Sequence, residues 1–355
     1  MSAEPSTVEA LQAELITHHT VCIRGGGTKS PPDRAATISL RRLAGIVEYA
    51  PDECVLTARA GTPLAEIEGT LSEHGQYLPF DPPLASRGAT IGGTVAAGAS
   101  GPLRYRYGGV RDFVIGVHVI DGEGRSIRSG GKVVKNAAGF LLHHAVVGSQ
   151  GSFGVLSEVT LKVFPKPEAR ATVVVTCGDL GAAATTARTL ESLRFDLEAL
   201  DFAGSGRVWA RLAGRRDALV ARVARVIDAV GGTAVPAADE ERLWVAARDF
   251  AWAPLTAAVV RIPLSGNANS LSAGCAATGA GDTARYTCGG RSLWIATSDL
   301  PALESSLTAN RLRGVIVRGH RAGTTIGAVE RNVFEERVRR VLDPHNRFRA
   351  ASDSA

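Results

Sequence analysis

Before Pro167, the apolar residues of the chain occur in short segments that glycine and proline interrupt. Apolar and polar side chains alternate over residues 155–164, which is the period of a half-buried strand. Residues 113–120 and 125–129 flank the sequence Asp-Gly-Glu-Gly, a combination typical of a hairpin. This part of the chain is therefore predicted to consist mainly of short strands joined by tight turns.

One clear helix interrupts these strands. Thr62 is expected to cap it, and Pro63 suits its first turn. Apolar residues then recur at helical spacing from residue 64 to residue 71, and Gly75 ends the helix.

After Pro167 the pattern changes to longer helices, rich in Ala and Arg, that alternate with strands. The expected helices span residues 179–193, 219–230 and 330–342, and the expected strands span residues 171–176, 207–213, 257–264, 292–297 and 314–318. We predict an α+β layer in which helices cover one face of an antiparallel sheet.

The composition indicates an ordered protein with enough apolar residues for two cores, because 45% of its 355 residues are hydrophobic. The net charge of +5 favours an acidic partner or a ligand that carries phosphate. No basic segment contains the interleaved aromatic residues of single-strand binders, so no nucleic acid is expected as a partner.

The cysteines are dispersed and include no Cys-x-x-Cys pair: they are Cys22, Cys54, Cys177, Cys275 and Cys288. This spacing fits neither a disulfide framework nor a zinc or iron–sulfur site, so no metal is expected. In place of a signal peptide the N-terminus has a capping box of Ser6 and Glu9, and no apolar stretch is long enough to cross a bilayer. We expect a cytoplasmic protein without a transmembrane segment.

Two glycine runs give the strongest indication of a ligand. Residues 24–29 are Arg-Gly-Gly-Gly-Thr-Lys, and residues 90–94 are Thr-Ile-Gly-Gly-Thr. Backbone N–H groups at glycines can converge on an anion, so we expect both runs to hold one pyrophosphate, and a Cβ at Gly26 or Gly92 to intrude on its path. A threonine precedes the lysine of the first run and prolines follow it, which excludes a P-loop, and the Rossmann fingerprint is absent.

The runs belong to an ordered series of motifs at residues 24–28, 61–64, 78–83, 90–93, 106–112, 135–139 and 148–155. The series closely resembles the PCMH-type FAD-binding family, also called the vanillyl-alcohol oxidase type. Within that family it is most similar to the FAD-binding E subunit of bacterial glycolate oxidase. The resemblance spans residues 21–167 and, more weakly, residues 341–348.

The resemblance implies that FAD lies extended between two α+β subdomains of a PCMH-type FAD-binding domain, residues 1–167. An α+β cap domain with an antiparallel sheet, for a substrate or an interface, would follow at residues 168–329, and the helix and tail at residues 330–355 would return toward the FAD domain. The implied FAD-binding residues are Arg24, Gly25, Gly26, Gly27, Thr28, Lys29, Pro82, Thr90, Gly92, Gly93, Thr94, Ser100, Gly101, Gly151, Gly154 and Val155. Since Thr28 stands where covalent members have their flavin-linking His, the FAD is expected to be non-covalent.

The chain departs from the family at two motifs. Residues 135–142 lack the Tyr and Asp of the corresponding family motif, and residues 346–349, Asn-Arg-Phe-Arg, replace the usual Asn-Pro-Gly. Neither departure touches the glycine runs.

The implied activity is the oxidation of glycolate, a 2-hydroxy acid, to glyoxylate, with hydride transfer to flavin N5. Electrons would pass to an iron–sulfur subunit in a complex with a larger FAD-linked oxidase subunit, through which the protein could also associate peripherally with the inner face of the membrane. This chemistry needs a base and an Arg that holds the carboxylate, and the candidates are His320 and Arg318, although a surface loop explains His320 equally well. The alternatives are a non-catalytic scaffold that holds flavin, and a stand-alone FAD oxidase of D-lactate or a sugar lactone.

Overall fold

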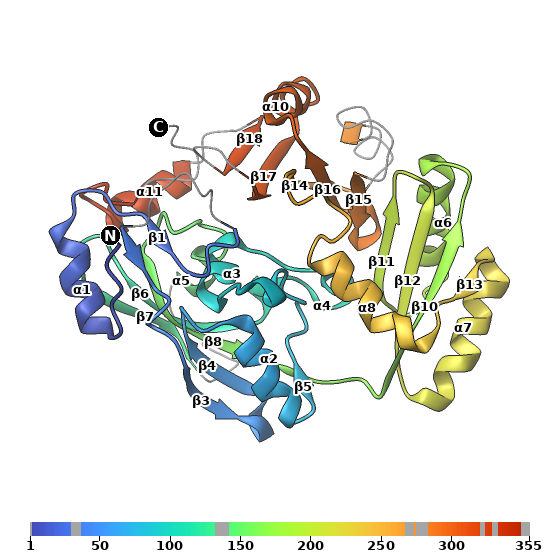
Figure 1. Ribbon diagram of the computed structural model, residues 1–355, viewed down its shortest axis with the longest axis horizontal. Helices are drawn as coiled ribbons and strands as arrows, with labels where there is room; N and C mark the ends of the chain where they lie inside the picture. Colours follow the sequence, from blue (N-terminus) through green and yellow to red (C-terminus); the bar gives the residue numbers. More distant parts are fainter. Residues whose placement is uncertain are drawn as a thin grey trace.

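The computed structural model describes residues 2–29, 37–131, 142–266, 273–274, 283–319, 324–328 and 333–348. They form two halves that meet along a seam, and the last helix, α11 (Val333–Leu342), lies on the same side of the molecule as the first helix, α1 (Val8–Thr17) (Figure 1). Within these residues, no helix combines the length and apolarity that a bilayer crossing requires.

The first half is built on a five-stranded antiparallel sheet in the order β3-β4-β8-β6-β7. Its strands are β3 (Ile46–Ala50), β4 (Val55–Arg59), β6 (Val114–Ile120), β7 (Ser126–Gly130) and β8 (Val155–Lys162). Smaller elements surround the sheet: β1 (Ile23–Arg24), β2 (Ile38–Ser39), α2 (Leu64–Glu73), β5 (Gln76–Tyr77), α3 (Ile91–Ala97), α4 (Arg104–Tyr107), α5 (Leu142–Ala145) and β9 (Phe164–Pro165). The predicted hairpin is confirmed, since β6 pairs with β7 and Asp121 Oδ1 accepts hydrogen bonds from the N–H groups of Glu123 and Arg125.

The second half holds a nine-stranded antiparallel sheet in the order β13-β10-β12-β11-β15-β16-β14-β17-β18. Its elements are β10 (Ala169–Thr176), α6 (Leu180–Ser192), β11 (Leu197–Ala203), β12 (Arg207–Gly214), α7 (Arg216–Val230), β13 (Thr233–Ala234), α8 (Ala237–Arg248), β14 (Ala258–Pro263), β15 (Ala284–Thr287), the 3-10 turn η4 (Cys288–Gly290), β16 (Ser292–Thr297), α10 (Leu300–Ala309), β17 (Arg313–Arg318) and β18 (Thr325–Gly327). Helices α6, α7 and α10 contribute to the same buried cluster as the sheet and cover its outer face, which confirms the predicted layer (Figure 1). The sequence pattern missed β11, β13, β15, β18, α8 and α10.

The chain end returns to the first half. The N–H of Val21 donates to the carbonyl of Arg347 at 2.9 Å, and the N–H of Gly122 donates to the carbonyl of Leu342 at 2.7 Å. Phe348 is only 2% exposed and belongs to the core of the first half. The segment in which Asn-Arg-Phe replaces the usual family ending therefore packs against the domain that begins the chain.

Two helix starts differ from the sequence expectation. Thr7, not Ser6, caps α1 by accepting a hydrogen bond from the N–H of Ala10. Helix α2 begins after Pro63, and the Thr62 hydroxyl donates to the carbonyls of Arg59 and Gly45 instead of capping the helix. The N–H of Leu64 lies in the first turn and has no acceptor within the helix, so it donates to the carbonyl of Ala89, which ties the helix to the residue before the second glycine run.

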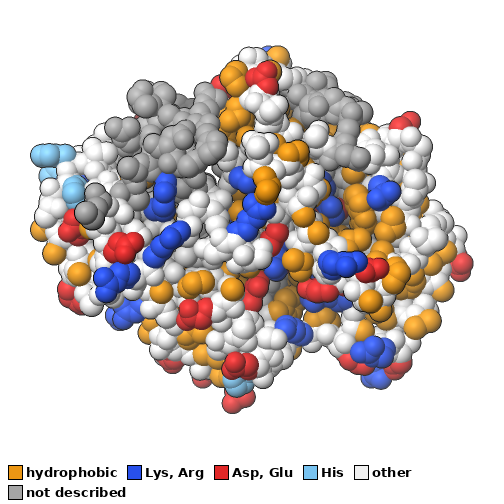
Figure 2. All heavy atoms as spheres, viewed as in Figure 1, with side chains coloured by type: hydrophobic (Ala, Val, Ile, Leu, Met, Phe, Trp, Pro, Cys, Tyr) orange, Lys and Arg blue, Asp and Glu red, His pale blue; other side chains and the backbone are white. Residues whose placement is uncertain are grey.

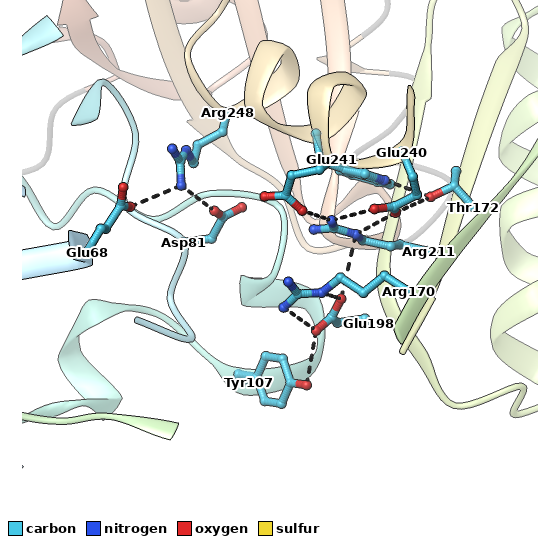
Figure 3. Close-up of polar contacts among 11 residues, drawn as sticks. Glu68, Asp81, Tyr107, Arg170, Thr172, Glu198, Arg211, Glu240, Glu241 and Arg248 are labelled. Atoms are coloured by element: carbon cyan, nitrogen blue, oxygen red, sulfur yellow. Dashed lines mark hydrogen bonds and ion pairs between the residues drawn. The ribbon is translucent and has the colours of Figure 1, made fainter. Parts of the chain in front are cut away.

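Buried ion pairs hold the second half together on the face of the sheet that meets the seam (Figure 3). The guanidinium of Arg211, on β12, donates to both carboxylate oxygens of Glu240, on α8, at 2.8 and 2.9 Å, and to Glu241 at 2.9 Å. The Arg211 side chain is only 3% exposed. Beside it, Arg170 forms a two-pronged bond to Glu198, whose side chain is fully buried.

Charged side chains of the second half also contact the first half across the seam. Tyr107, from the first half, donates to the Glu198 carboxylate at 3.3 Å. At the end of α8, Arg248 contacts Glu68 and Asp81 of the first half at 3.2 Å each (Figure 3). Helix α8 therefore joins the two halves through charged side chains.

We predict that Arg211→Met lowers the free energy of unfolding by about 3–5 kcal/mol, because Glu240 would remain buried without its partner. Urea denaturation followed by circular dichroism measures the loss. Arg242→Met is the matched control, since this arginine of α8 is 81% exposed and its pair with Asp239 should contribute less than about 1 kcal/mol. Equal stabilities of the two variants would contradict the structural role of Arg211.

Candidate functional site

The two glycine runs meet at one pocket of the first half. Its lining includes Arg24, Gly25, Gly26, Gly27, Thr28 and Lys29 from the first run, Thr90, Gly92 and Gly93 from the second, and Gly151, Gly154 and Val155 from the turn before β8. Thr324 and Phe348, from the end of the chain, complete the wall. Segments far apart in sequence thus enclose a single space, as a ligand of extended shape requires.

The second run is helical. Residues 91–97 form α3, and the Thr90 hydroxyl caps it by accepting from the N–H of Gly93 at 3.3 Å. A Cβ at Gly92 would meet Ala60 Cβ at 2.6 Å, whereas a Cβ at Gly93 would meet only Thr90 Oγ1 at 3.2 Å. Gly92 therefore permits close packing of α3, and Gly93 faces the pocket.

The first run packs in the same way. A Cβ at Gly26 would clash with the carbonyl oxygen of Gly88, which precedes the second run. The expectation that Cβ atoms at Gly26 and Gly92 would block a phosphate was therefore wrong in its cause, because they would strike the protein itself. Gly27 has a φ of +74°, which few residues other than glycine adopt.

Lys29 supplies positive charge to this pocket. Its Nζ donates to the buried hydroxyl of Thr94 at 3.1 Å, and no described carboxylate forms an ion pair with it. Burial lowers the pKa of Lys29 to about 7, although the negative charge of Asp249 acts in the opposite direction. An ammonium group that loses hydration without gaining a carboxylate fits a bound phosphate. The N–H groups of Gly92 and Gly93 already donate to Ala60 and Thr90, so in the second run the charge of Lys29 is the feature that favours an anion.

A second pocket, with a volume of about 810 Å³, lies at the seam. Its walls include Ser100, Gly101 and Arg104 from the first half, and Arg261 and Trp294 from the sheet of the second. Lys and Arg side chains also gather in the furrow between the halves (Figure 2). We call this space the cationic pocket.

Arg261 is the unusual residue of the cationic pocket. Its Nη1 donates to the carbonyl of Gly98 at 3.0 Å, and its buried Nε has no hydrogen-bond partner. Burial lowers the pKa of Arg261 to about 10, and the nearby guanidinium of Arg104 lowers it further. Neither arginine forms an ion pair with a described carboxylate, so this part of the pocket is suited to an anion.

Two other arginines of the pocket are paired. Arg291 donates to Glu191 at 2.7 Å, and Arg106 forms an ion pair with Asp196. Within the described residues, no group of three or more His, Cys, Asp or Glu side chains is arranged to hold a metal ion.

The remaining predicted residues lie elsewhere. Pro82 is not among the residues that line either pocket, and Thr94 contributes through Lys29. The guanidinium of Arg318 donates to the backbone carbonyls of Pro254 and Ala257, at 2.6 and 3.3 Å. His320 and residues 135–141 fall outside the described residues.

Sequence reasoning missed Arg104 and Arg261. A usable signal existed for Arg261, because a single Arg stands inside the apolar strand Ala-Val-Val-Arg-Ile-Pro of β14. An isolated charge in such a strand needs a partner or a ligand. Arg104 stands in the run Arg-Tyr-Arg-Tyr, whose pattern does not distinguish it from Arg106.

Comparison with known proteins agrees with this geometry. Residues 3–130 match the FAD binding domain family. The chain is 47% identical over 150 residues to glycolate oxidase subunit GlcE of Escherichia coli (strain K12). The aligned segment covers 41% of this chain and 43% of the relative. It is 32% identical over 151 residues to a D-lactate dehydrogenase of Archaeoglobus fulgidus, which covers 41% of this chain and 33% of the relative. The matches span less than half the length of either relative.

The fold extends the likeness to both halves. The crystal structure of p-cresol methylhydroxylase with substrate bound superposes with a TM-score of 0.72, covering 98% of this chain and 87% of that one at 14% identity. The predicted fold class, a PCMH-type FAD-binding domain followed by an α+β cap with an antiparallel sheet, is confirmed.

We predict that Gly93→Val weakens FAD binding about tenfold or more, which corresponds to about 1.4 kcal/mol, because the added methyl groups would extend into the first pocket. The flavin absorbance per mole of purified protein measures the loss. Gly69→Val, on an exposed position of α2 where a Cβ meets nothing within 4 Å, is the control and should retain FAD. A folded Gly93→Val protein with full FAD content would contradict the assignment of this pocket.

A second prediction concerns pH. Phosphate binding favours the charged form of Lys29, so above pH 7 the binding of FAD must bring a proton with it. The dissociation constant of FAD should therefore rise by up to about tenfold per pH unit between about pH 7 and 9. Quenching of FAD fluorescence by apoprotein measures this, and Lys29→Met should bind weakly with little pH dependence. A wild-type affinity that stays constant across this range would exclude Lys29 from the phosphate site.

Proposed function

We propose, for a chain whose residues 3–130 belong to the FAD-binding domain family, that it oxidises a 2-hydroxy acid with non-covalent FAD as a subunit of a glycolate oxidase type of complex. Bound FAD would supply the acceptor for the hydride that leaves the substrate's α-carbon. The first pocket would hold the pyrophosphate, and the cationic pocket would hold the substrate.

The observation that carries this proposal is the continuity of the two pockets along residues 90–101. Gly92 and Gly93 line the first pocket, and Ser100 and Gly101 line the cationic pocket. Ala97 also lines the first pocket, and its Cα is at most about 11 Å from the Cα of Ser100 in the cationic pocket. A dinucleotide with its pyrophosphate in the first pocket therefore has the reach to present its ring at the second.

In this proposal Arg261 holds the carboxylate of the substrate. A guanidinium presents parallel N–H donors that match a carboxylate. The buried Nε of Arg261 has no hydrogen-bond partner within the protein, so binding a carboxylate would break no existing bond of this atom. Arg104 adds a second positive charge, which a neutral or cationic ligand would not need. The pair favours a small acid, of which glycolate and D-lactate are the substrates in the names of two relatives.

The catalytic pair of His320 and Arg318 stays a prediction, and the present proposal gives the role of holding the carboxylate to Arg261 instead. Arg318 lies on β17, which pairs with the strand of Arg261, and its bonds to the carbonyls of residues 254 and 257 hold the loop before that strand. In the present proposal Arg318 positions β14, and Arg261 contacts the substrate.

Electrons would leave through a partner. The name of one relative describes a subunit, and we infer an assembly with a larger FAD-linked oxidase subunit and an iron–sulfur subunit in the cytoplasm or at the inner face of the membrane. Co-purification of an iron–sulfur protein with the tagged chain from its own cell tests this part of the proposal.

The test of the activity is anaerobic addition of glycolate or D-lactate to the FAD-loaded chain. We expect the flavin absorbance to bleach, and Arg261→Met to raise the substrate concentration for half-maximal bleaching about 10- to 100-fold through the loss of charge-assisted hydrogen bonds. Arg188→Met, on the exposed face of α6, is the control. A flavin that stays oxidised with every 2-hydroxy acid would favour the scaffold alternative.

A further inference from the structure

A small cavity lies against the cationic pocket. Its volume is about 20 Å³, which accommodates a single water molecule. Ser100, Gly101, Thr287 and Trp294 line both spaces, so these residues alone form the shared wall. The small cavity therefore lies directly beside the pocket in which we place the substrate, and we call it the side chamber.

Four residues that line this chamber have a buried polar atom without a hydrogen-bond partner, and one of these atoms, Arg248 Nε, lies 3.6 Å from Asp249 Oδ1. Asp201 Oδ1, Arg285 Nη2, Arg248 Nε and Trp252 Nε1 are buried without a hydrogen-bond partner among the described residues, and all four residues line the chamber. One acceptor and three donors match the two to four partners that a buried water usually has. The chamber is thus built for a water that touches Asp201.

Asp201 lies on β11, at the centre of the seam, and is 0% exposed. Its Oδ2 accepts a hydrogen bond from Arg285 Nε at 3.0 Å, while its Oδ1 is buried without a hydrogen-bond partner. The buried carboxylates of the neighbouring network differ, because Glu198 and Glu240 each accept hydrogen bonds on both oxygens.

The charges around Asp201 set its proton affinity. Burial raises the pKa of Asp201 to about 6, and the guanidinium of Arg285 on β15 limits the rise. The amide of Cys288, in η4, also lowers this pKa, although it forms no hydrogen bond with Oδ1, and Asp81 of the first half raises it. Arg248 faces the chamber from the end of α8, and burial raises the pKa of the Cys288 thiol to about 12, so that it stays uncharged.

We propose that Asp201 accepts the proton of the substrate's α-hydroxyl group through the water in the side chamber. The O–H bond breaks and its electrons form the new C=O bond, while the C–H bond breaks and its electron pair leaves as hydride to the FAD of the proposed function. The products are a 2-oxo acid, reduced flavin and the neutral carboxylic acid of Asp201. This inference rests on the proposed function, because it needs a bound 2-hydroxy acid and an oxidised flavin.

The test compares the wild type with Asp201→Asn in the FAD-loaded chain. Rates of anaerobic flavin reduction are measured from pH 4.5 to 8, and oxalate binding is measured by the shift of the flavin spectrum. We expect the wild-type rate to rise through about pH 6, and the Asp201→Asn rate at pH 7 to be about 10²- to 10⁴-fold lower without that rise. Oxalate should bind both proteins alike, which separates proton transfer from substrate binding.

Two further variants test whether structural damage alone could explain a slower Asp201→Asn protein. Glu240→Gln breaks another buried carboxylate pair, away from the chamber, and should keep the wild-type pH profile. Trp252→Phe removes one donor from the chamber and leaves Asp201 intact, so it should lower the rate roughly tenfold and keep the pH dependence.

A readout without catalysis comes from thermal unfolding of the apoprotein. The pKa of Asp201 in the folded chain lies above the unfolded value of about 3.9, so wild-type stability should fall as pH rises from about 4 to about 6. Asp201→Asn should lack this component of the fall.

The outcomes separate the two claims. If no 2-hydroxy acid reduces the wild-type flavin, the proposed function fails and the role of Asp201 falls with it. If the wild type is reduced but Asp201→Asn keeps the same rate and pH profile, the proton acceptor lies elsewhere and only the present inference is overturned.

Discussion

Removal of charged groups from water at the seam is the constraint on which the rest of the structure depends. Each ion taken from water costs several kcal/mol unless a partner compensates it. Arg211 and Glu240 meet that condition within the second half, and Arg248 meets it against Glu68 and Asp81 of the first. The relative position of the halves, and with it the shape of the cationic pocket between them, follows from these pairings.

The glycines of the two runs serve different physical purposes. Gly26 and Gly92 lie where another segment comes too close for a side chain, so they allow the runs to pack together. Gly93 and the Lys29–Thr94 pair face the enclosed space and determine what it can bind. A motif written as a string of glycines thus combines packing with recognition, and only the structure separates the two.

Much of the fold could be predicted from sequence because its elements follow local rules. Strand β8 alternates, the β6–β7 hairpin has a turn of Asp and Gly, and β14, β16 and β17 are apolar runs between breakers. The order of the motifs also indicated the family and its cofactor.

The missed elements are those in which local rules fail. Strand β11 is buried along its whole length but contains Glu198 and Asp201, which look like surface residues until Arg170 and Arg285 are placed beside them. Helix α8 has an acidic first turn, yet it buries Glu240 against Arg211. Their partners lie 28 or more positions away in sequence, so a local pattern contains no sign of them.

The presence or absence of a carboxylate partner distinguishes two kinds of buried cation in this protein. Arg170, Arg211 and Arg248 are compensated by carboxylates of the chain, and their positions are fixed in the folded state whatever is bound. Lys29 and Arg261 have lost hydration without gaining a described carboxylate, and burial lowers the pKa of each. A protein that leaves a cation in this state forgoes stability that a nearby Asp or Glu would restore. Lys29 and Arg261 line the two pockets that residues 90–101 join, so an anion in each pocket would restore stability there, and one extended phosphate ligand together with one small acid would satisfy both.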